Sequence, residues 1–399
     1  MSIYLDHAST TPLRREALEA MLPYLSEHWG NPSSIHHSGR RARQGLDEAR
    51  ESVAMLLGAK PREIVFTSGG TESDNLAISG VAWAASARGR HIVTTAVEHK
   101  AVLQECALLG RHGFDVTYVG VDGDGLVDPE AVAAAINERT VLVSVMAANN
   151  EVGTVQPVAE IGSICRARRV AFHVDAVQAA PFLPIDVNAW QADVVSISGH
   201  KLYGPKGIGA LFVRQGTAMV PLLQGGAQER QRRAGTENVA AAVGLATAFA
   251  LAADEAMLTA ESSRLSGLRD ALLAGLTAIP GVHRTGHATQ RLPNSASVVI
   301  DGIEGGDLVA ALDLEGIEAS TGSACTTGSV EPSHVLLAMG IDAERARGSL
   351  RLTLGRENTE ADVVATIDAV ERGVARLRAA APAREPAEAP AAMSAAPSV

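Results

Sequence analysis

The sequence is poor in aromatic residues and in cysteine. Aromatic residues make up 3% of the 399 positions, and the three cysteines are Cys106, Cys165 and Cys325. They lie far apart and form neither a CxxC pair nor a Cys/His metal spacing, so neither a disulfide framework nor a metal site is predicted. An odd, sparse cysteine count is typical of a reducing compartment.

Long apolar runs and a strong basic charge are also missing. The longest apolar run, 239–253, is shorter than the roughly 20 residues that span a bilayer, and its Ala-rich composition favours a buried helix. Residues 1–7 contain no charged segment followed by an apolar one, so no secretory signal is visible. The net charge of −11 argues against a broad phosphate-binding surface. We therefore expect a cytoplasmic protein with no membrane contact and no direct nucleic-acid binding.

The residues that are abundant predict an α/β fold. Hydrophobic residues make up 46% of the chain. Short, mostly apolar segments predict strands at Glu63–Thr67, His91–Thr95, Val116–Val119, Val141–Val145, Val170–Val174, Val194–Ile197 and Ile208–Val213. Ala-rich helical segments at Asp74–Ala87, Pro129–Asn137 and Val158–Arg168 fall between them. This alternation predicts a mainly parallel sheet of seven strands with helices on both faces.

The pattern changes after Ala253. Helices are predicted at Glu255–Ala278, Gly306–Glu315 and Thr359–Ala379, with strands at Ser295–Ile300 and Gly348–Leu354. This mixture favours a smaller α+β domain with a boundary near residue 255. We predict a large domain over 13–255, a small domain over 1–12 and 256–378, and a disordered Ala/Pro-rich tail over 379–399.

A glycine-rich turn follows the first predicted strand of the large domain. In the run Thr67–Glu72, Gly69 and Gly70 let the backbone approach an anion, and the helix that follows supplies unpaired N–H groups. Thr71 is a candidate helix cap and a hydroxyl donor to that anion. An ordinary glycine turn with a threonine cap remains the alternative. The chain has no GxxxxGK[ST] motif and no GxGxxG after a strand, so nucleotide binding has no support.

Two strand ends carry charged residues suited to catalysis. Asp175 closes one predicted strand, with Gln178 three residues later, where a carboxylate faces the ligand crevice of an open sheet. Taken alone, Asp175 is more readily a helix cap. Lys201, in Ser198-Gly199-His200-Lys201, follows another strand, and its small neighbours suit a desolvated amine that forms a Schiff base. A surface lysine is the alternative.

Four further residues complete the set of candidates. His99 precedes a predicted helix, which suits a cap, and Asn150 lies in the run 149–151. Arg351 lies inside an apolar strand and needs an anionic partner if that face is buried; a substrate carboxylate would serve. Cys325 lies in Thr-Gly-Ser-Ala-Cys-Thr-Thr-Gly, a flexible setting that favours a presented nucleophile over a packed thiol.

These elements occur in an order that resembles a known family. The order is Gly69-Gly70-Thr71, His99, Asn150, Asp175-x-x-Gln178, Ser198-x-His200-Lys201, Gly235-Thr236-Glu237-Asn238, Gly322-Ser323-Ala324-Cys325 and Arg351. From about residue 4 to 378 the chain resembles the pyridoxal-phosphate-dependent cysteine desulfurases, of class V of the aminotransferases. Its cysteine loop is similar to that of the subgroup that supplies sulfur for iron–sulfur clusters or tRNA thiolation. The resemblance implies the fold type I of pyridoxal-phosphate-dependent transferases.

The resemblance also implies roles for individual residues. Lys201 would be the Schiff-base lysine, Cys325 the nucleophile that becomes a persulfide, and His99 a ring-stacking residue and the candidate for proton handling. The other implied contacts are Asp175 with the pyridine nitrogen, Gln178 with the phenolic oxygen, Gly70, Thr71, Ser198 and His200 with the phosphate, and Asn150 and Arg351 with the amino-acid substrate. Asn150 is also expected to contact the cofactor. Thr236 would reach the phosphate of a neighbouring subunit, which implies a homodimer with shared active sites.

The implied reaction converts L-cysteine to L-alanine and passes the sulfur to an acceptor protein, either an iron–sulfur scaffold or a tRNA-thiolation enzyme. The Ala/Pro-rich C-terminus does not resemble the docking tail of members that serve a cluster scaffold. A selenocysteine lyase, an ordinary aminotransferase and a sulfur-relay scaffold that mainly binds partners are the alternatives.

Overall fold

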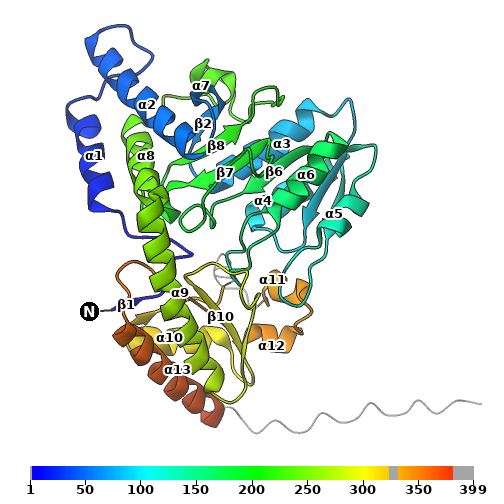
Figure 1. Ribbon diagram of the computed structural model, residues 1–399, viewed down its shortest axis with the longest axis vertical. Coiled ribbons are helices and arrows are strands. Elements are labelled where there is room, and N and C mark those ends of the chain that lie inside the picture. The colour runs from blue at the N-terminus through cyan, green and yellow to red at the C-terminus, as the bar shows by residue number, and fades with distance from the viewer. Residues whose placement is uncertain (1, 323–330, 381–399) are drawn as a thin grey trace, which may run out of the picture.

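The computed structural model describes residues 2–322 and 331–380 (Figure 1). The larger part of the chain is built around a seven-stranded sheet with the order β2-β8-β7-β6-β5-β3-β4. Its strands are β2 (Ile64–Thr67), β3 (His91–Thr95), β4 (Asp115–Val119), β5 (Thr140–Met146), β6 (Ala171–Asp175), β7 (Val194–Ser198) and β8 (Gly209–Val213). All neighbouring strands pair in parallel except at β8, which is antiparallel to both β7 and β2.

Helices cover both faces of this sheet, as the apolar character of its strands requires. One face packs on α3 (Gly70–Ala84) and α4 (Lys100–Arg111) through an aliphatic core that includes Leu76 and Val102. The opposite face packs on helices from several parts of the chain, with Leu46, Ile161 and Leu245 in its core. The remaining helices of this part are α1 (Arg15–Ser26), α2 (His37–Leu56), α5 (Pro129–Ala135), α6 (Val158–Arg168), α7 (Gln228–Gln231) and α8 (Val239–Ala253).

A smaller α+β layer follows in the sequence and lies at the lower end of Figure 1. Its antiparallel sheet has the order β12-β10-β9, and a parallel pair joins β1 to β11. The strands are β1 (Ile3–Tyr4), β9 (Val282–Arg284), β10 (Ser295–Ile300), β11 (Ile317–Glu318) and β12 (Ser349–Thr353). The helices are α9 (Glu255–Ala278), α10 (Gly305–Leu314), α11 (His334–Ala338), α12 (Ala343–Arg347) and α13 (Glu360–Ala380). A separate leucine-rich core joins α9, α10 and α13 to the sheet.

The predicted fold class is confirmed, and the differences concern helices that were not predicted, such as α1 and α2, and the ends of several elements. The helix predicted from Asp74 begins earlier, at Gly70, and Gly69 is its N-cap residue. Thr71 therefore lies within the first turn, and the prediction that it caps the helix is wrong. The helix predicted over Pro129–Asn137 ends two residues early, at Ala135, where Ile136 returns to extended backbone. The predicted tail from residue 379 overlaps the last two residues of α13, and residues 381–399 lie outside the described part.

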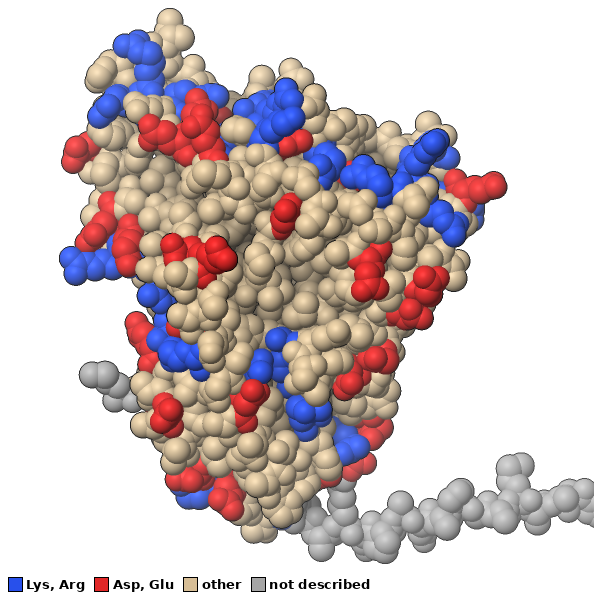
Figure 2. Space-filling model, in the orientation of Figure 1, with Lys and Arg blue, Asp and Glu red and all other residues tan. Residues whose placement is uncertain are grey.

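The junction between α8 and α9 is a sharp bend at Asp254. The two helices meet at 70°, and Asp254 caps α9 by accepting a hydrogen bond from the Met257 N–H at 2.9 Å. In the described residues no single helix has the length and apolar character to cross a membrane; the bent pair α8–α9 reaches that threshold only by length and composition. On the face shown in Figure 2, acidic and basic side chains are interspersed over a mostly uncharged surface.

Candidate active site

A cavity of about 410 Å³ lies where several loops meet beyond the strand ends of the large sheet. Polar residues follow β2, β3, β5, β6 and β7 at the same edge, because parallel strands present their carboxyl ends together. Ten of the predicted site residues line this cavity: Gly70, Thr71, His99, Asn150, Asp175, Gln178, Ser198, His200, Lys201 and Arg351. Segments separated by more than 250 positions in the sequence therefore form one site.

One end of the cavity is suited to an anion. Gly69 has φ 153° and ψ −172°, a conformation that is essentially restricted to glycine, and it places the start of α3 at the cavity. A Cβ at Gly70 would come within 2.9 Å of the Val177 side chain, so the backbone is closely approached there. The Ser198 hydroxyl is buried and has no hydrogen-bond partner among the described residues. An orphaned hydroxyl beside a helix N-terminus fits a phosphate oxygen.

A buried carboxylate marks another part of the cavity. Asp175 accepts a hydrogen bond from the Val177 N–H at 2.9 Å, but the residues after it form turns and not an α-helix, so it does not cap one. Burial raises the pKa of Asp175, and the electrostatic influence of the neighbouring His99 and Lys201 opposes that rise. A carboxylate in this setting gains most from a cationic partner such as a protonated ring nitrogen.

The two histidines of the cavity have different partners. Nδ1 of His99 accepts a hydrogen bond from the Ala101 N–H at 3.1 Å, so His99 is both the N-cap of α4 and a cavity residue. His200 lies 3.2 Å from the Thr10 hydroxyl through Nδ1. Burial and then the charge of Lys201 lower the pKa of His200 to about 4, so its imidazole is neutral at pH 7.

Lys201 and Gln178 both bind the backbone of the N-terminal segment. Nζ of Lys201 donates to the carbonyl oxygen of Ala8 and, at 2.7 Å, to that of Ser9. The Gln178 amide also donates to Ala8, at 2.9 Å. Residues next to β1 thus close the cavity over the lysine. The sequence did not predict this contact, because Ala8 and Ser9 contribute carbonyl groups that any residue type carries.

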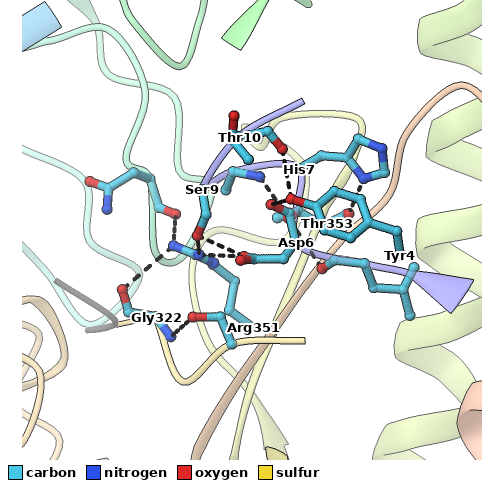
Figure 3. A network of polar contacts seen from close by, with 12 residues as sticks. Tyr4, Asp6, His7, Ser9, Thr10, Gly322, Arg351 and Thr353 are labelled. Carbon is cyan, nitrogen blue, oxygen red and sulfur yellow. Dashed lines mark hydrogen bonds and ion pairs between the residues drawn. The ribbon is translucent and has the colours of Figure 1, made fainter. Parts of the chain in front are cut away.

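Arg351 joins the small sheet to the cavity (Figure 3). It lies within β12, is 3% exposed, and donates to Asp6 Oδ1 and to the Ser9 hydroxyl, both at 2.8 Å. The guanidinium also donates to the carbonyl oxygen of Asn150 at 3.1 Å. The expectation that a buried arginine needs an anionic partner is therefore met by Asp6, which the sequence reasoning did not select as a site residue.

One predicted site residue does not line this cavity, and another lies outside the described residues. Thr236 lies on an exposed loop and does not line it. Cys325 lies outside the described residues, although Gly322, three positions before it, lines the cavity. A cavity residue that the sequence reasoning missed is Asp74, on α3. Its sequence neighbours Glu72, Ser73 and Asn75 are also polar, so residue type gave no signal there.

Two further polar segments, at Asp122 and at His36, have local structural roles. Asp122 Oδ1 accepts hydrogen bonds from the N–H groups of Asp124 and Leu126, both at 2.9 Å, which forms a turn. His36 caps α2. Within the described part of the chain, no group of three or more His, Cys, Asp or Glu side chains is arranged to hold a metal ion.

Comparison with known proteins identifies the family. The family model for class V aminotransferases matches residues 3–365. A cysteine desulfurase IscS of Methanosarcina thermophila is 51% identical over 382 residues, covering 96% of this chain and 94% of the relative. A cysteine desulfurase IscS of Dictyoglomus turgidum is 48% identical over 384 residues, covering 96% and 97%.

Solved structures also align with this chain over most of its length. A NifS-like protein aligns with a TM-score of 0.89 at 40% identity, covering 94% of this chain and all of the other. The protein SspA, solved in complex with cysteine, aligns with a TM-score of 0.79 at 37% identity, covering 88% and 99%.

The class V family uses pyridoxal phosphate, and the cavity suits this group. The orphaned Ser198 hydroxyl and the N-terminus of α3 would hold its phosphate, Asp175 would pair with its ring nitrogen, and Lys201 would bind its aldehyde. Sequence, fold and cavity thus agree that this chain belongs to the cysteine desulfurases of the class V aminotransferase family.

Proposed function

We propose that this protein is a cysteine desulfurase that converts L-cysteine to L-alanine and transfers the sulfur atom to Cys325. The observation that carries this proposal is the convergence of Lys201, Asp175, His99 and Arg351 on one cavity. The cysteine-bound structure of SspA, at 37% identity, supports the choice of substrate. No contact in the cavity favours selenocysteine over cysteine, so a selenocysteine lyase is tested by comparing turnover of the two amino acids.

Arg351 and Asn150 are the proposed substrate-binding residues. Both line the cavity, and Arg351 donates one hydrogen bond to the Asn150 carbonyl oxygen. Arg351 contacts only one oxygen of Asp6, and its remaining partners are the Ser9 hydroxyl and the carbonyl oxygens of Asn150 and Gly322, so a substrate carboxylate that enters the cavity would replace neutral partners with a charged one. We therefore assign the α-carboxylate of the substrate to Arg351.

Lys201 and Asp175 are the proposed residues that serve the cofactor. Bound pyridoxal phosphate acts as an electron sink that weakens bonds at the α-carbon of an amino acid. Lys201 Nζ would hold the aldehyde of the cofactor and would move a proton at the substrate α-carbon. Asp175 would hold the ring nitrogen protonated, and Thr71, Gly70, Ser198 and His200 would orient the phosphate.

The sulfur transfer step is assigned to Cys325. Its thiolate attacks the substrate sulfur, so an S–S bond forms as the substrate Cβ–S bond breaks. The net change is L-cysteine plus Cys325 thiol to L-alanine plus Cys325 persulfide. An unperturbed thiol has a pKa of about 8.5 and is mostly protonated at neutral pH, so a base is needed, and His99 is the candidate. Cys106 and Cys165 are poor nucleophiles because burial raises the pKa of each to about 12.

The domain boundary, the oligomeric state and the sulfur-acceptor protein are further parts of this proposal. We propose a large cofactor-binding domain over 13–255 and a small domain formed by 1–12 and 256–378. We also propose a cytoplasmic homodimer in which Thr236 reaches the phosphate in the neighbouring active site; the exposure of Thr236 supports this role. The sulfur acceptor would be an iron–sulfur scaffold or a tRNA-thiolation enzyme.

Spectra and product assays of purified holoenzyme test the proposed function. Addition of L-cysteine with a reductant should change the cofactor absorbance and yield alanine and sulfide together. Lys201→Ala should abolish both products and alter the absorbance of the bound cofactor. Cys325→Ala should abolish sulfide release by at least a hundredfold while leaving the resting absorbance unchanged.

Cys165→Ala is the matched control, because it removes a thiol that is buried away from the cavity. It should retain activity within about twofold. Loss of the cofactor absorbance in Cys325→Ala, or full sulfide release by it, would contradict the assignment of Cys325.

A further inference from the structure

Asp74 is a buried carboxyl group in the cavity that the proposed reaction does not use. It lies in the second turn of α3, is 1% exposed, and lines the cavity together with Asp175. Its Oδ1 atom has no hydrogen-bond partner among the described residues. The Nε2 atom of His173 is 3.6 Å from this oxygen and is already bonded to the Ser196 hydroxyl at 3.0 Å. An ionised oxygen without a donor in such a place is strongly unfavourable.

Asp175 is in the opposite situation. It accepts a hydrogen bond from the Val177 N–H, and both His99 and Lys201 oppose the rise in its pKa. Two buried carboxyl groups that share one cavity do not both ionise readily, because each charge opposes the other. The backbone donor and the Lys201 amine act on Asp175, so the negative charge belongs there and the proton belongs on Asp74.

The groups around Asp74 also favour a proton on Asp74 and the negative charge on Asp175. His173 is fully buried and bonded at both ring nitrogens, to Ser144 and Ser196, and burial lowers its pKa to about 3, so it supplies no cation. Glu98 is another buried carboxyl with an unpartnered oxygen, and burial raises its pKa to about 8. Burial first, and then the charge of Asp175, raise the pKa of Asp74 well above its ordinary value, and the Ser196 hydroxyl opposes this rise only in part.

We propose that Asp74 is a positioning residue that stays protonated and thereby confines the negative charge of the cavity floor to Asp175. This inference rests on the proposed role of Asp175 as partner of the cofactor ring nitrogen. An ionised Asp74 would compete for the same cation from a different direction and would raise the proton affinity of Asp175. The neutral acid instead lines the cavity without a charge and leaves Asp175 as the counter-charge for the ring.

The test compares the isosteric neutral variant Asp74→Asn with Asp74→Ala and with Asp175→Asn, all as purified full-length holoenzyme. Asparagine keeps the volume and the neutral charge, so Asp74→Asn should bind pyridoxal phosphate within threefold of the wild type. Its cofactor absorbance should titrate at the same pH within about half a unit. Asp175→Asn should weaken cofactor binding by more than tenfold. Asp74→Ala should fall between them, because it leaves a cavity.

Infrared spectroscopy detects a protonated carboxyl group directly. The C=O stretch of a protonated carboxyl at pH 7 should be lost in part in Asp74→Asn and retained in Asp175→Asn, with Glu98→Gln removing the remainder. A tenfold loss of cofactor affinity in Asp74→Asn, or an unchanged protonated-carboxyl band, would show that Asp74 is charged and would overturn the proposal.

Stability against pH gives a readout that does not require activity. A carboxyl group whose pKa is raised in the folded state binds its proton more tightly there than in the unfolded chain, so it lowers stability as pH rises above about 4. Asp74→Asn removes this loss, and its melting temperature relative to the wild type should increase steadily from pH 5 to pH 8. A difference that is flat with pH contradicts a protonated Asp74. These readouts remain valid if the desulfurase assay fails, so the two proposals can be judged separately.

Discussion

Two buried arginines of this protein form ion pairs of different kinds. Arg50, on α2, makes a bidentate pair with Glu229 at 2.6 and 2.7 Å, and the two side chains are 4% and 1% exposed. Glu229 Oε2 also accepts a hydrogen bond from the Phe66 N–H, and the guanidinium lies 4.8 Å from the Phe66 ring centre. Both carboxylate oxygens of Glu229 accept hydrogen bonds, and we call such an ion pair closed.

The ion pair between Arg351 and Asp6 is open, which here means that Arg351 contacts only one oxygen of the carboxylate. Its single charged contact reaches one oxygen of Asp6, whose side chain is 21% exposed, and its other partners are a hydroxyl and carbonyl groups. Unlike Arg50, it lines the cavity. The difference teaches that burial of a charge does not by itself indicate function. The structural pair uses both oxygens of its carboxylate away from this cavity, whereas the Arg351 pair uses one carboxylate oxygen and lines a cavity that a ligand can enter.

The closed pair also fixes an unusual turn. Glu229, Arg230 and Gln231 all have φ between 46° and 65°, a left-handed run that is unfavourable for residues other than glycine. Glu229 ties this run to α2, and Arg233 ties the same segment to Glu72 on α3 at 2.9 Å. The loop that carries Thr236 is therefore held to the large domain at two points.

Breaking the closed pair should have the largest effect on stability. Glu229→Ala leaves the Arg50 cation buried without a carboxylate, which costs about 3–5 kcal/mol. Chemical denaturation should show this loss in the free energy of unfolding. The double variant Arg50→Met/Glu229→Leu should recover much of it, because no unpaired charge remains. A loss below about 1 kcal/mol in Glu229→Ala would remove the distinction between the two pairs.

Changing the open pair should affect substrate binding more than stability. Arg351→Lys replaces a planar fork by a point charge, and the loss of charged hydrogen bonds of about 1.5–3 kcal/mol predicts a rise in KM for cysteine of roughly tenfold to a hundredfold. Steady-state kinetics would measure it, with the resting cofactor absorbance as the control for folding. An unchanged KM with a large loss of stability would mean that Arg351 is structural, as Arg50 is.

Removing the carboxylate of the open pair should have the smallest effect and a favourable sign for binding. Asp6→Asn leaves Arg351 anchored by Ser9 and by the Asn150 carbonyl but removes the group that competes with the substrate carboxylate. An ion pair of this partly exposed kind is worth up to about 1 kcal/mol, so KM should fall by up to about fivefold. An increase in KM would show that Asp6 mainly orients Arg351.

The parts of the fold that sequence reasoning predicted are those with local periodic signals. The predicted ends of α9 and β10 are confirmed at Glu255–Ala278 and Ser295–Ile300, because apolar spacing and the flanking Pro280-Gly281 turn mark them. Helices α1 and α2 were not predicted. Helix α2 is strongly charged on its outer face and contains glycines that pack closely; a Cβ at Gly45 would overlap the Tyr24 ring at 2.3 Å. Such a helix is recognisable only with its neighbours in place.

The residues of the site also divide into those that a local sequence signal marks and those that it does not. Asp175, Lys201 and Ser198 were predictable because a charged or hydroxyl residue at the end of an apolar strand stands out against its neighbours. Asp6 was not, because its importance comes from the pairing of the N-terminal segment with the small sheet, where Asp6 bridges to Thr353. Asp74 was not, because only the packing of α3 reveals that a carboxylate on it points into a cavity and lacks a donor.

The amino-acid sequence by itself determined the α/β class, the order of the motifs and the residue types available for chemistry, because these depend on hydrophobic periodicity and on side-chain identity. The tertiary structure decided which carboxyl groups are buried together in the cavity and which arginine lines it. Those properties depend on the distance between groups that are hundreds of residues apart and on their removal from water, and neither is encoded in local spacing.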